Sequence, residues 1–159
     1  MYIDNEMVFS DSQALTVGAF SPGENVYDLG VRHAIGNGEP MAVVFVVDVD
    51  AVQTGGDEDY SFEAEYCLNS DQTGTRTGFG RITFESGTPT PPAHDADLLV
   101  AGYRFYLPVP PTPIEQSYRY LGVRYAVISA TAAITCSSFL VPMSMIDATI
   151  DYPTGISIT

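Results

Sequence analysis

The sequence predicts an all-β protein, an antiparallel sandwich of about eight strands. Apolar residues recur with a period of two, and turn-rich segments containing Gly, Pro, Asp and Ser separate the apolar runs. No segment longer than about ten residues carries an apolar stripe at helical spacing. A jelly roll and an immunoglobulin-like sandwich both fit this pattern, although the chain has no Trp to supply the buried tryptophan of the latter.

The first half of the chain contains one weak helical signal and one strong strand. Asp11–Val17 is the most helix-like piece, because its first two residues can cap a helix. Met41–Val49 is apolar on both faces, which predicts a central, covered strand. The glycines before it, Gly36 and Gly38, precede a strand instead of opening a helix. We therefore interpret them as turn positions and not as a phosphate-binding loop.

Further strands follow from alternation. In "YSFEAEYCL" (60–68), Tyr60 and every second residue to Leu68 face the core, and the remaining positions form a wet face: Ser61, Glu63, Glu65 and Cys67. In "SYRYLGVRYAV" (117–127) the apolar positions share one face and Tyr118 and Tyr120 lie on the other. Shorter candidates are Ile82–Phe84, Leu98–Leu107 and Ile134–Pro142.

A chain of 159 residues suggests one folding unit. We divide it into an N-terminal arm with a short irregular segment (1–20), a sandwich domain (21–145) and an extended C-terminal tail (146–159). The longer loops, 86–97 and 108–116, are rich in proline, which cannot donate to a ladder and so marks connections or edges.

The charge balance restricts the partners. Twenty acidic residues face six basic ones, all arginine, for a net charge of −14. Such a chain lacks the basic face that nucleic acid or an anionic membrane requires. The first residues show no signal peptide, and the longest apolar run, Met41–Val47, is too short to span a bilayer. We expect synthesis in a cytoplasm, no nucleic-acid partner and no membrane partner.

Catalytic and metal chemistry receive little support. The two cysteines, Cys67 and Cys136, fit no zinc motif, and we interpret them as buried free thiols, with a single bridge as the alternative. The histidines are not clustered, and no Gly-x-Ser-x-Gly elbow frames a nucleophile. Segment 57–59 is acidic but follows no EF-hand spacing, so a solvated hairpin tip is favoured over an irregular calcium site. We predict no catalytic residue, no cofactor and no metal.

Aromatic residues outside the core pattern point to a protein interface. Tyr118 and Tyr120 flank Arg119, and tyrosine and arginine are enriched at interfaces. The moderately apolar segments at the two ends are either disordered arms or arms that pair with a sheet edge of a neighbour. The candidate interface residues are Tyr2, Ile3, Met7, Phe9, Tyr118, Arg119, Tyr120 and Tyr152.

Several motifs, in order, resemble one known family. "MYIDNEMVFSDSQALT", "VYDLG", "IGNGEP", "LVAGYRFYLPVP" and "YRYLGVRYAV" resemble the jelly-roll capsid cement, or decoration, proteins of tailed bacteriophages, up to about residue 145. The proline-rich loops and the segment after Pro142 depart from that pattern. The resemblance implies a jelly roll, no enzymatic activity and a place on the outside of the virion. It also implies two partners: the major capsid protein and further copies of this chain, as a dimer or trimer.

Two other function classes compete with this interpretation. The first is a carbohydrate- or receptor-binding module of a phage tail, with Tyr103, Tyr106 and Tyr118 as a sugar platform. The second is a hydrolase, for which Glu63 and Glu65 share one strand face, although a charged outer face explains that pair better.

Overall fold

The computed structural model describes residues 7–30, 39–87, 89, 91–110 and 118–146, without the side chains of residues 19 and 20. Its described part is all-β and contains no α-helix. The N-terminal strands are β1 (Val8–Thr16), β2 (Gly18–Pro22), β3 (Tyr27–Asp28), β4 (Met41–Val49) and β5 (Asp59–Cys67). The later elements are β6 (Arg76–Glu85), β7 (His94–Asp95), β8 (Arg104–Val109), β9 (Tyr120–Ile128) and β10 (Ala133–Pro142), with short 3₁₀ turns η3 (Ala96–Leu98) and η4 (Met143–Met145).

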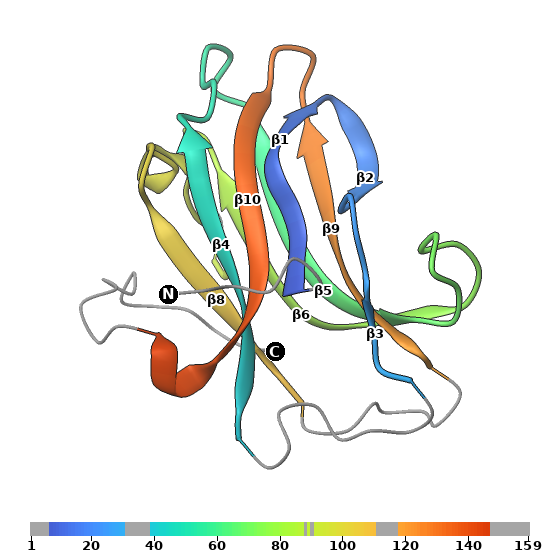
Figure 1. Ribbon diagram of the computed structural model, residues 1–159. Coiled ribbons are helices and arrows are strands. Elements are labelled where there is room, and N and C mark those ends of the chain that lie inside the picture. Colours follow the sequence, from blue (N-terminus) through green and yellow to red (C-terminus); the bar gives the residue numbers. More distant parts are fainter. Residues whose placement is uncertain (1–6, 31–38, 88, 90, 111–117, 147–159) are drawn as a thin grey trace.

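Two sheets pack face to face as a sandwich (Figure 1). One sheet has four strands in the order β1-β10-β4-β8. The other has the order β2-β9-β5-β6-β7, with β3 also paired to β9. Every pairing is antiparallel except that of β6 with β7. Each sheet thus interleaves strands from both halves of the chain, which is the jelly-roll connection that the sequence predicted.

Aromatic rings fill the space between the sheets. Phe45 stacks on Phe105 with ring centroids 5.1 Å apart, and Phe62 meets Phe105 edge to face at 4.9 Å. Tyr125 comes from β9, and its ring packs edge to face on Phe45 and Phe62. These rings lie on alternate positions of their strands, so the period-two pattern delivers them to one shared core.

The predicted central strand is confirmed, and the predicted helix is wrong. β4 has the bounds Met41–Val49 and lies between β10 and β8. Asp11–Val17 falls instead within and directly after β1, which pairs with β10 from Val8 to Thr16. A register shift occurs between Ser10 and Gln13, and Ser12 has a φ of 52°. This bulge obscures the alternation in the sequence, and the sandwich begins at Val8 instead of residue 21.

The region before β8 also differs from its prediction. Leu98–Leu107 begins at the last residue of η3 and includes a turn before the strand begins at Arg104. Asp95 caps η3 by accepting a hydrogen bond from the Asp97 N–H at 2.9 Å. Leu99 is buried, and Gly102, with a φ of 90°, turns the chain into β8. The apolar run here is therefore a capped turn packed on the core, followed by a shorter strand.

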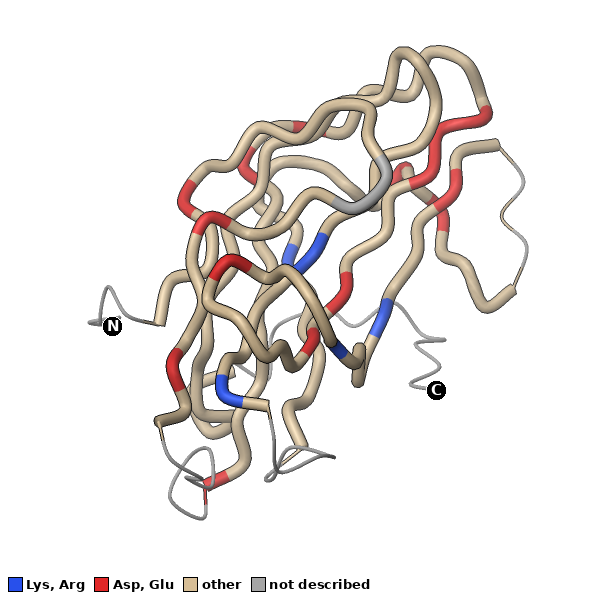
Figure 2. The backbone as a smooth tube through the Cα atoms, turned by 90° about the vertical axis from the view of Figure 1, so that its right-hand side faces the viewer, with Lys and Arg blue, Asp and Glu red and all other residues tan. Residues whose placement is uncertain are grey.

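The charges are unevenly distributed along the sandwich. Figure 2 shows acidic residues over the whole height of the molecule, whereas the arginines that the structure describes lie in its middle and lower parts. The upper end in this view carries acidic residues alone among its charged groups.

Candidate functional site

The outer face of the four-stranded sheet is apolar, although it points away from the sandwich core. Its side chains come from alternate positions on each strand, opposite to those that fill the core. Ala42, Val44 and Val141 are buried, at 0%, 4% and 4% exposure. Around them lie half-buried residues of the same kind: Val8, Val46, Tyr106, Pro108 and Phe139.

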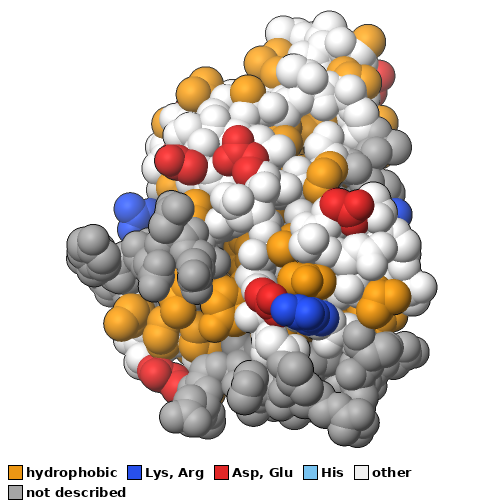
Figure 3. Space-filling view, turned by 45° about the vertical axis from the view of Figure 1, so that its right-hand side comes forward, with side chains coloured by type: hydrophobic (Ala, Val, Ile, Leu, Met, Phe, Trp, Pro, Cys, Tyr) orange, Lys and Arg blue, Asp and Glu red, His pale blue; other side chains and the backbone are white. Residues whose placement is uncertain are grey.

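This surface, which we call the sheet face, consists of Val8, Ala42, Val44, Val46, Tyr106, Pro108, Phe139 and Val141. Register places them side by side, since Val44 pairs with both Phe139 and Tyr106 and Val8 pairs with Phe139. Hydrophobic side chains gather at the lower left of Figure 3, where this face comes into view. The two-sided apolarity of Met41–Val49 was the signal for it in the sequence.

The predicted interface residues of the N-terminal arm separate in the structure. Phe9 is fully buried in the sandwich core, and Met7 is half-buried against that core. Phe9 is therefore a packing residue of β1 and not a contact held out for a partner. Tyr2, Ile3 and Tyr152 lie outside the described residues.

The predicted residues around β9 also take different roles. Tyr118 is 6% exposed, and its hydroxyl lies 2.7 Å from Thr77 Oγ1, so it is not on the outer face where the sequence placed it. Arg119 is exposed and donates to both carboxylate oxygens of Asp28, at 2.9 and 2.7 Å. Its guanidinium also lies 5.3 Å from the ring centre of the half-buried Tyr120. The hydrogen bonds from the Arg119 guanidinium are the main reason why the pKa of Asp28 is lowered.

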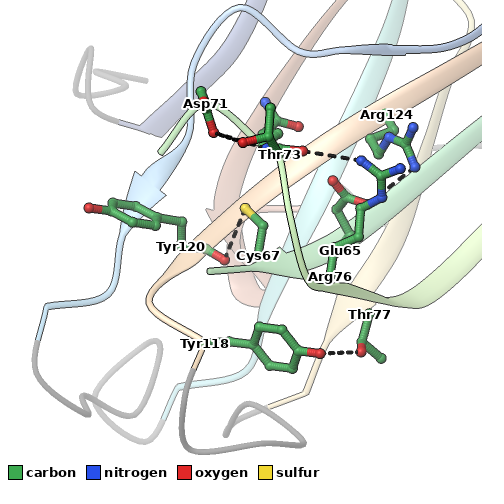
Figure 4. A network of polar contacts seen from close by, with 10 residues as sticks. Glu65, Cys67, Asp71, Thr73, Arg76, Thr77, Tyr118, Tyr120 and Arg124 are labelled. Carbon is green, nitrogen blue, oxygen red and sulfur yellow. Dashed lines mark hydrogen bonds and ion pairs between the residues drawn. The ribbon is translucent and has the colours of Figure 1, made fainter. Parts of the chain in front are cut away.

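A second cluster lies on the outer face of the larger sheet, beneath the β5–β6 connection (Figure 4). Glu65 is 1% exposed; its Oε2 lies 3.7 Å from Arg124 Nη1 and 3.9 Å from Arg76 Nε. The connection folds back over this carboxyl. Within it, the side-chain amide of buried Gln72 donates to the Gly23 carbonyl at 3.2 Å, and the backbone carbonyl of Gln72 accepts from Arg76 Nη1 at 3.2 Å.

The predicted wet face of β5 is thus wrong for Ser61, Glu65 and Cys67, which are all buried, and a segment later in the chain covers Glu65. Burial raises the pKa of Glu65 to about 7, against the opposing attraction of Arg124 and Arg76. Glu65 Oε1 and Gln72 Oε1 are buried without a hydrogen-bond partner. The cluster therefore holds a carboxyl that takes up a proton near neutral pH.

The cysteines are buried free thiols, as predicted. Cys67 lies beside this cluster and donates to the Tyr120 carbonyl at 3.7 Å. Burial raises the pKa of Cys67 to about 12, and burial likewise raises that of Cys136 to about 12. Both thiols stay protonated at neutral pH and are poor nucleophiles.

The acidic tip of the β4–β5 loop is organised around one carboxylate. Glu58 is fully buried and accepts from the N–H groups of Gly55 and Gly56 and from the hydroxyls of Ser86 and Thr131. The Gly55 N–H and the Ser86 hydroxyl are the main reasons why the pKa of Glu58 is lowered to about 2. Hydrogen-bond donors occupy both carboxylate oxygens, so Glu58 acts as a turn-forming anion.

Two general findings complete this description. Among the residues that the structure describes, no group of three or more His, Cys, Asp and Glu side chains is arranged to hold a metal ion. Within the same part of the chain, no helix has the length and hydropathy of a membrane span.

Comparison with known proteins gives one family. The family model described as Bbp16 matches residues 9–142, from the first core residue of β1 to the last residue of β10. No curated protein matches the chain. The matched region covers both sheets of the sandwich, and the chain belongs to the Bbp16 family, which is phage-associated.

Proposed function

We propose that the protein is a capsid cement, or decoration, protein. It has no enzymatic activity, binds the outside of a phage head and bridges neighbouring major capsid protein subunits, acting as a homo-oligomer. Membership of a phage-associated family supports the setting. The sheet face carries the proposal, because its half-buried members, such as Val46, Pro108 and Phe139, are apolar side chains that lie outside the core between the sheets.

The sheet face suits a second copy of the chain. An isologous interface presents the same patch from both partners, so it must be self-complementary. Apolar side chains such as Val8 and Phe139 meet this condition, whereas two acidic surfaces would repel each other. Copies joined through this face would carry their shell contacts together.

Multivalency turns modest contacts into durable attachment. When one copy of an oligomer is bound, the others are held at a high effective concentration over the shell. Each single contact then needs little affinity. An acidic protein on the outside of the head also does not compete for the packaged nucleic acid.

The sugar platform of the tail-module alternative is not formed by the tyrosines suggested for it. Tyr118 is buried, and the Tyr103 ring packs against Phe84 and Phe105 with centroids 6.2 and 5.9 Å away. Only Tyr106 of the three lies on an outer face, and it is half-buried there. A carbohydrate site of stacked, exposed rings would need other residues.

Quantitative mass spectrometry of purified virions tests the proposal. A cement protein should be present at one copy per major capsid protein, or at a simple fraction of that number. It should also rebind to heads assembled without it. A copy number of a dozen or fewer would point to the tail, and absence from the particle would refute the proposal.

A further inference from the structure

One end of the sandwich combines exposed aliphatic side chains with acidic residues and no basic residue. We call it the upper end, as drawn in Figure 1, and define it as residues 16–18, 49–59, 85–87, 95–103 and 128–133. Backbone contacts join these segments: the Val52 N–H donates to the Ala133 carbonyl, and the Ala51 N–H to the Leu99 carbonyl, both at 2.9 Å. The Ser86 N–H donates to the Glu58 carbonyl at 2.9 Å. Backbone hydrogen bonds thus connect these loops into one continuous surface.

Exposed aliphatic residues are concentrated here. Seven large hydrophobic residues in the described chain are exposed, and five of them belong to the upper end: Val17, Val49, Val52, Val100 and Ile128. Four of the five are 51% to 57% exposed. Hydrophobic side chains are visible at the top of Figure 3. A stable core does not need these positions, so their clustering suggests a contact with another surface.

The same end carries half of the net charge of the chain. Its segments contain seven of the 20 acidic residues and none of the six arginines, which makes −7 of the total −14. Besides buried Glu58, the acids are Asp50, Asp57, Asp59, Glu85, Asp95 and Asp97. Figure 2 shows the same asymmetry. Burial, together with the neighbouring charges of Glu85 and Asp57, raises the pKa of Asp59.

We propose that the upper end is the surface that docks on the phage shell, at a site where basic side chains surround a small apolar patch. This inference rests on the proposed function and identifies the contact surface within it. An acidic end repels a second acidic copy and attracts a basic partner, which distinguishes its occupant from that of the sheet face. The valines and Ile128 supply the close contact once the charges have aligned the partners.

The two components predict different kinetic defects. Charges at the edge of an interface mainly change the association rate and its dependence on salt, whereas buried apolar contacts mainly change the dissociation rate. Removing acidic groups should slow binding at low ionic strength, and the defect should shrink as salt screens the field. Removing aliphatic groups should shorten the residence time at any salt concentration.

The experiment measures binding of labelled full-length protein to purified heads assembled without it. The apolar variant is Val49→Ser with Val100→Ser, and its matched control is Leu68→Ser with Met145→Ser. The control residues are exposed to a similar degree, 44% and 57%. They follow the C-terminal ends of β5 and β10, away from the upper end, where these strands begin. We expect the apolar variant to bind at least about tenfold more weakly through faster dissociation, and the control to bind as the wild type does.

The charge variant is Asp57→Asn with Asp97→Asn, and its matched control is Asp11→Asn with Glu39→Gln, which removes two exposed acids elsewhere. We expect slower association for the charge variant in 50 mM salt and wild-type rates in 500 mM salt. If the wild type binds heads and both upper-end variants bind as well as the wild type does, this inference is overturned and the cement function stays in place. Failure of the wild type itself to bind heads would refute both.

Discussion

Arg124 Nη1 lies 3.7 Å from Glu65 Oε2, yet the carboxyl group that this arginine faces has a pKa raised to about 7. Loss of hydration is the larger influence, since the Glu65 side chain is 1% exposed beneath the β5–β6 connection. In a buried ion pair of this kind, the attraction between the charges is smaller than the free energy lost by removing them from water. Glu65 is therefore neutral in a large fraction of molecules at neutral pH.

The pH dependence of folding should report this residue. In the unfolded chain the carboxyl has its ordinary pKa of 4.5, and in the folded chain a pKa of about 7. The folded state therefore binds the proton of Glu65 more tightly than the unfolded state does. The stability that this proton contributes is fully present below pH 4.5 and is lost as the pH rises to about 7. We expect the free energy of unfolding to fall by about 2 to 3 kcal/mol over this interval in urea titrations.

The variant Glu65→Gln isolates this effect. It keeps the shape of the side chain and removes the titration, so the decline between pH 4.5 and 7 should flatten. The matched control Glu63→Gln, on the same outer face of β5, should retain the decline. A Glu65→Gln protein that is equally destabilised at pH 5 and pH 8 would contradict the role of burial.

Glu58 should show the opposite sign. Donors from Gly55 and Ser86 lower its pKa from 4.5 to about 2, so its stabilising contribution exists above pH 4.5 and disappears as the pH falls to about 2. Glu58→Gln places an amide where N–H groups already point, and we expect its Tm at pH 7 to be several degrees lower. Differential scanning calorimetry should show this gap narrowing in acid.

Asp57→Asn is the matched control for this experiment. Asp57 is the exposed neighbour of Glu58 in the same turn, and its carboxylate accepts one bond from Ser129 Oγ at 3.1 Å. An asparagine oxygen can accept that bond, so the Tm should stay near that of the wild type. An equal loss in both variants would mean that the turn, and not the Glu58 carboxylate, determines the result.

The strands were predictable wherever the local residue pattern alone indicates which of their faces is buried. Met41–Val49 announces a covered strand because both faces are apolar, and the inner face of β5 follows from alternation. The outer face of β5 was not predictable, because Gln72 and its loop cover Glu65 only after the β5–β6 connection folds back over the sheet. The bulge at Ser12 hid β1 for a related reason, since its register is set by pairing with β10.

The candidate surfaces were predictable only in part. The acidic balance follows from composition, but its concentration at one end depends on three segments that are distant in sequence, 49–59, 85–87 and 95–103. Val49, Val100 and Ile128 are ordinary strand and loop residues when taken singly, and only the fold gathers them. Phe9 was predicted to contact a partner as an apolar residue of an N-terminal arm and Tyr118 as a tyrosine beside Arg119, yet both side chains are buried in the core.

Tyr125 should stabilise the sandwich through its hydroxyl as well as its ring. The hydroxyl lies 2.9 Å from Ser10 Oγ and 2.7 Å from Ser138 Oγ, so one side chain of β9 links two strands of the opposite sheet inside the core. Tyr125→Phe leaves buried hydroxyl groups with fewer partners, and we expect a loss of about 1 to 3 kcal/mol in denaturant unfolding.

Tyr66→Phe provides the comparison. Its hydroxyl makes one bond, to the Pro110 carbonyl at 2.9 Å. The loss should be smaller than for Tyr125→Phe, because fewer buried groups lose a partner. Equal stability of wild type and Tyr125→Phe would show that the serine hydroxyls find other partners at no cost.

Self-association through the sheet face can be tested at Phe139, which lies at the centre of that face beside Val8 and Val44. In a symmetric pair, Phe139→Glu adds a negative charge to both copies at the same interface, so repulsion adds to the lost apolar contact. We expect sedimentation velocity to give a dissociation constant for the oligomer at least about tenfold higher than that of the wild type. Leu68→Glu adds the same charge at an exposed site at the end of β5 and should leave the oligomer intact. A change of far-ultraviolet circular dichroism in Phe139→Glu would indicate misfolding, and in that case Phe139→Ser, which adds no charge, provides the measurement. A folded Phe139 variant that keeps the wild-type oligomer would exclude the sheet face as the contact between copies.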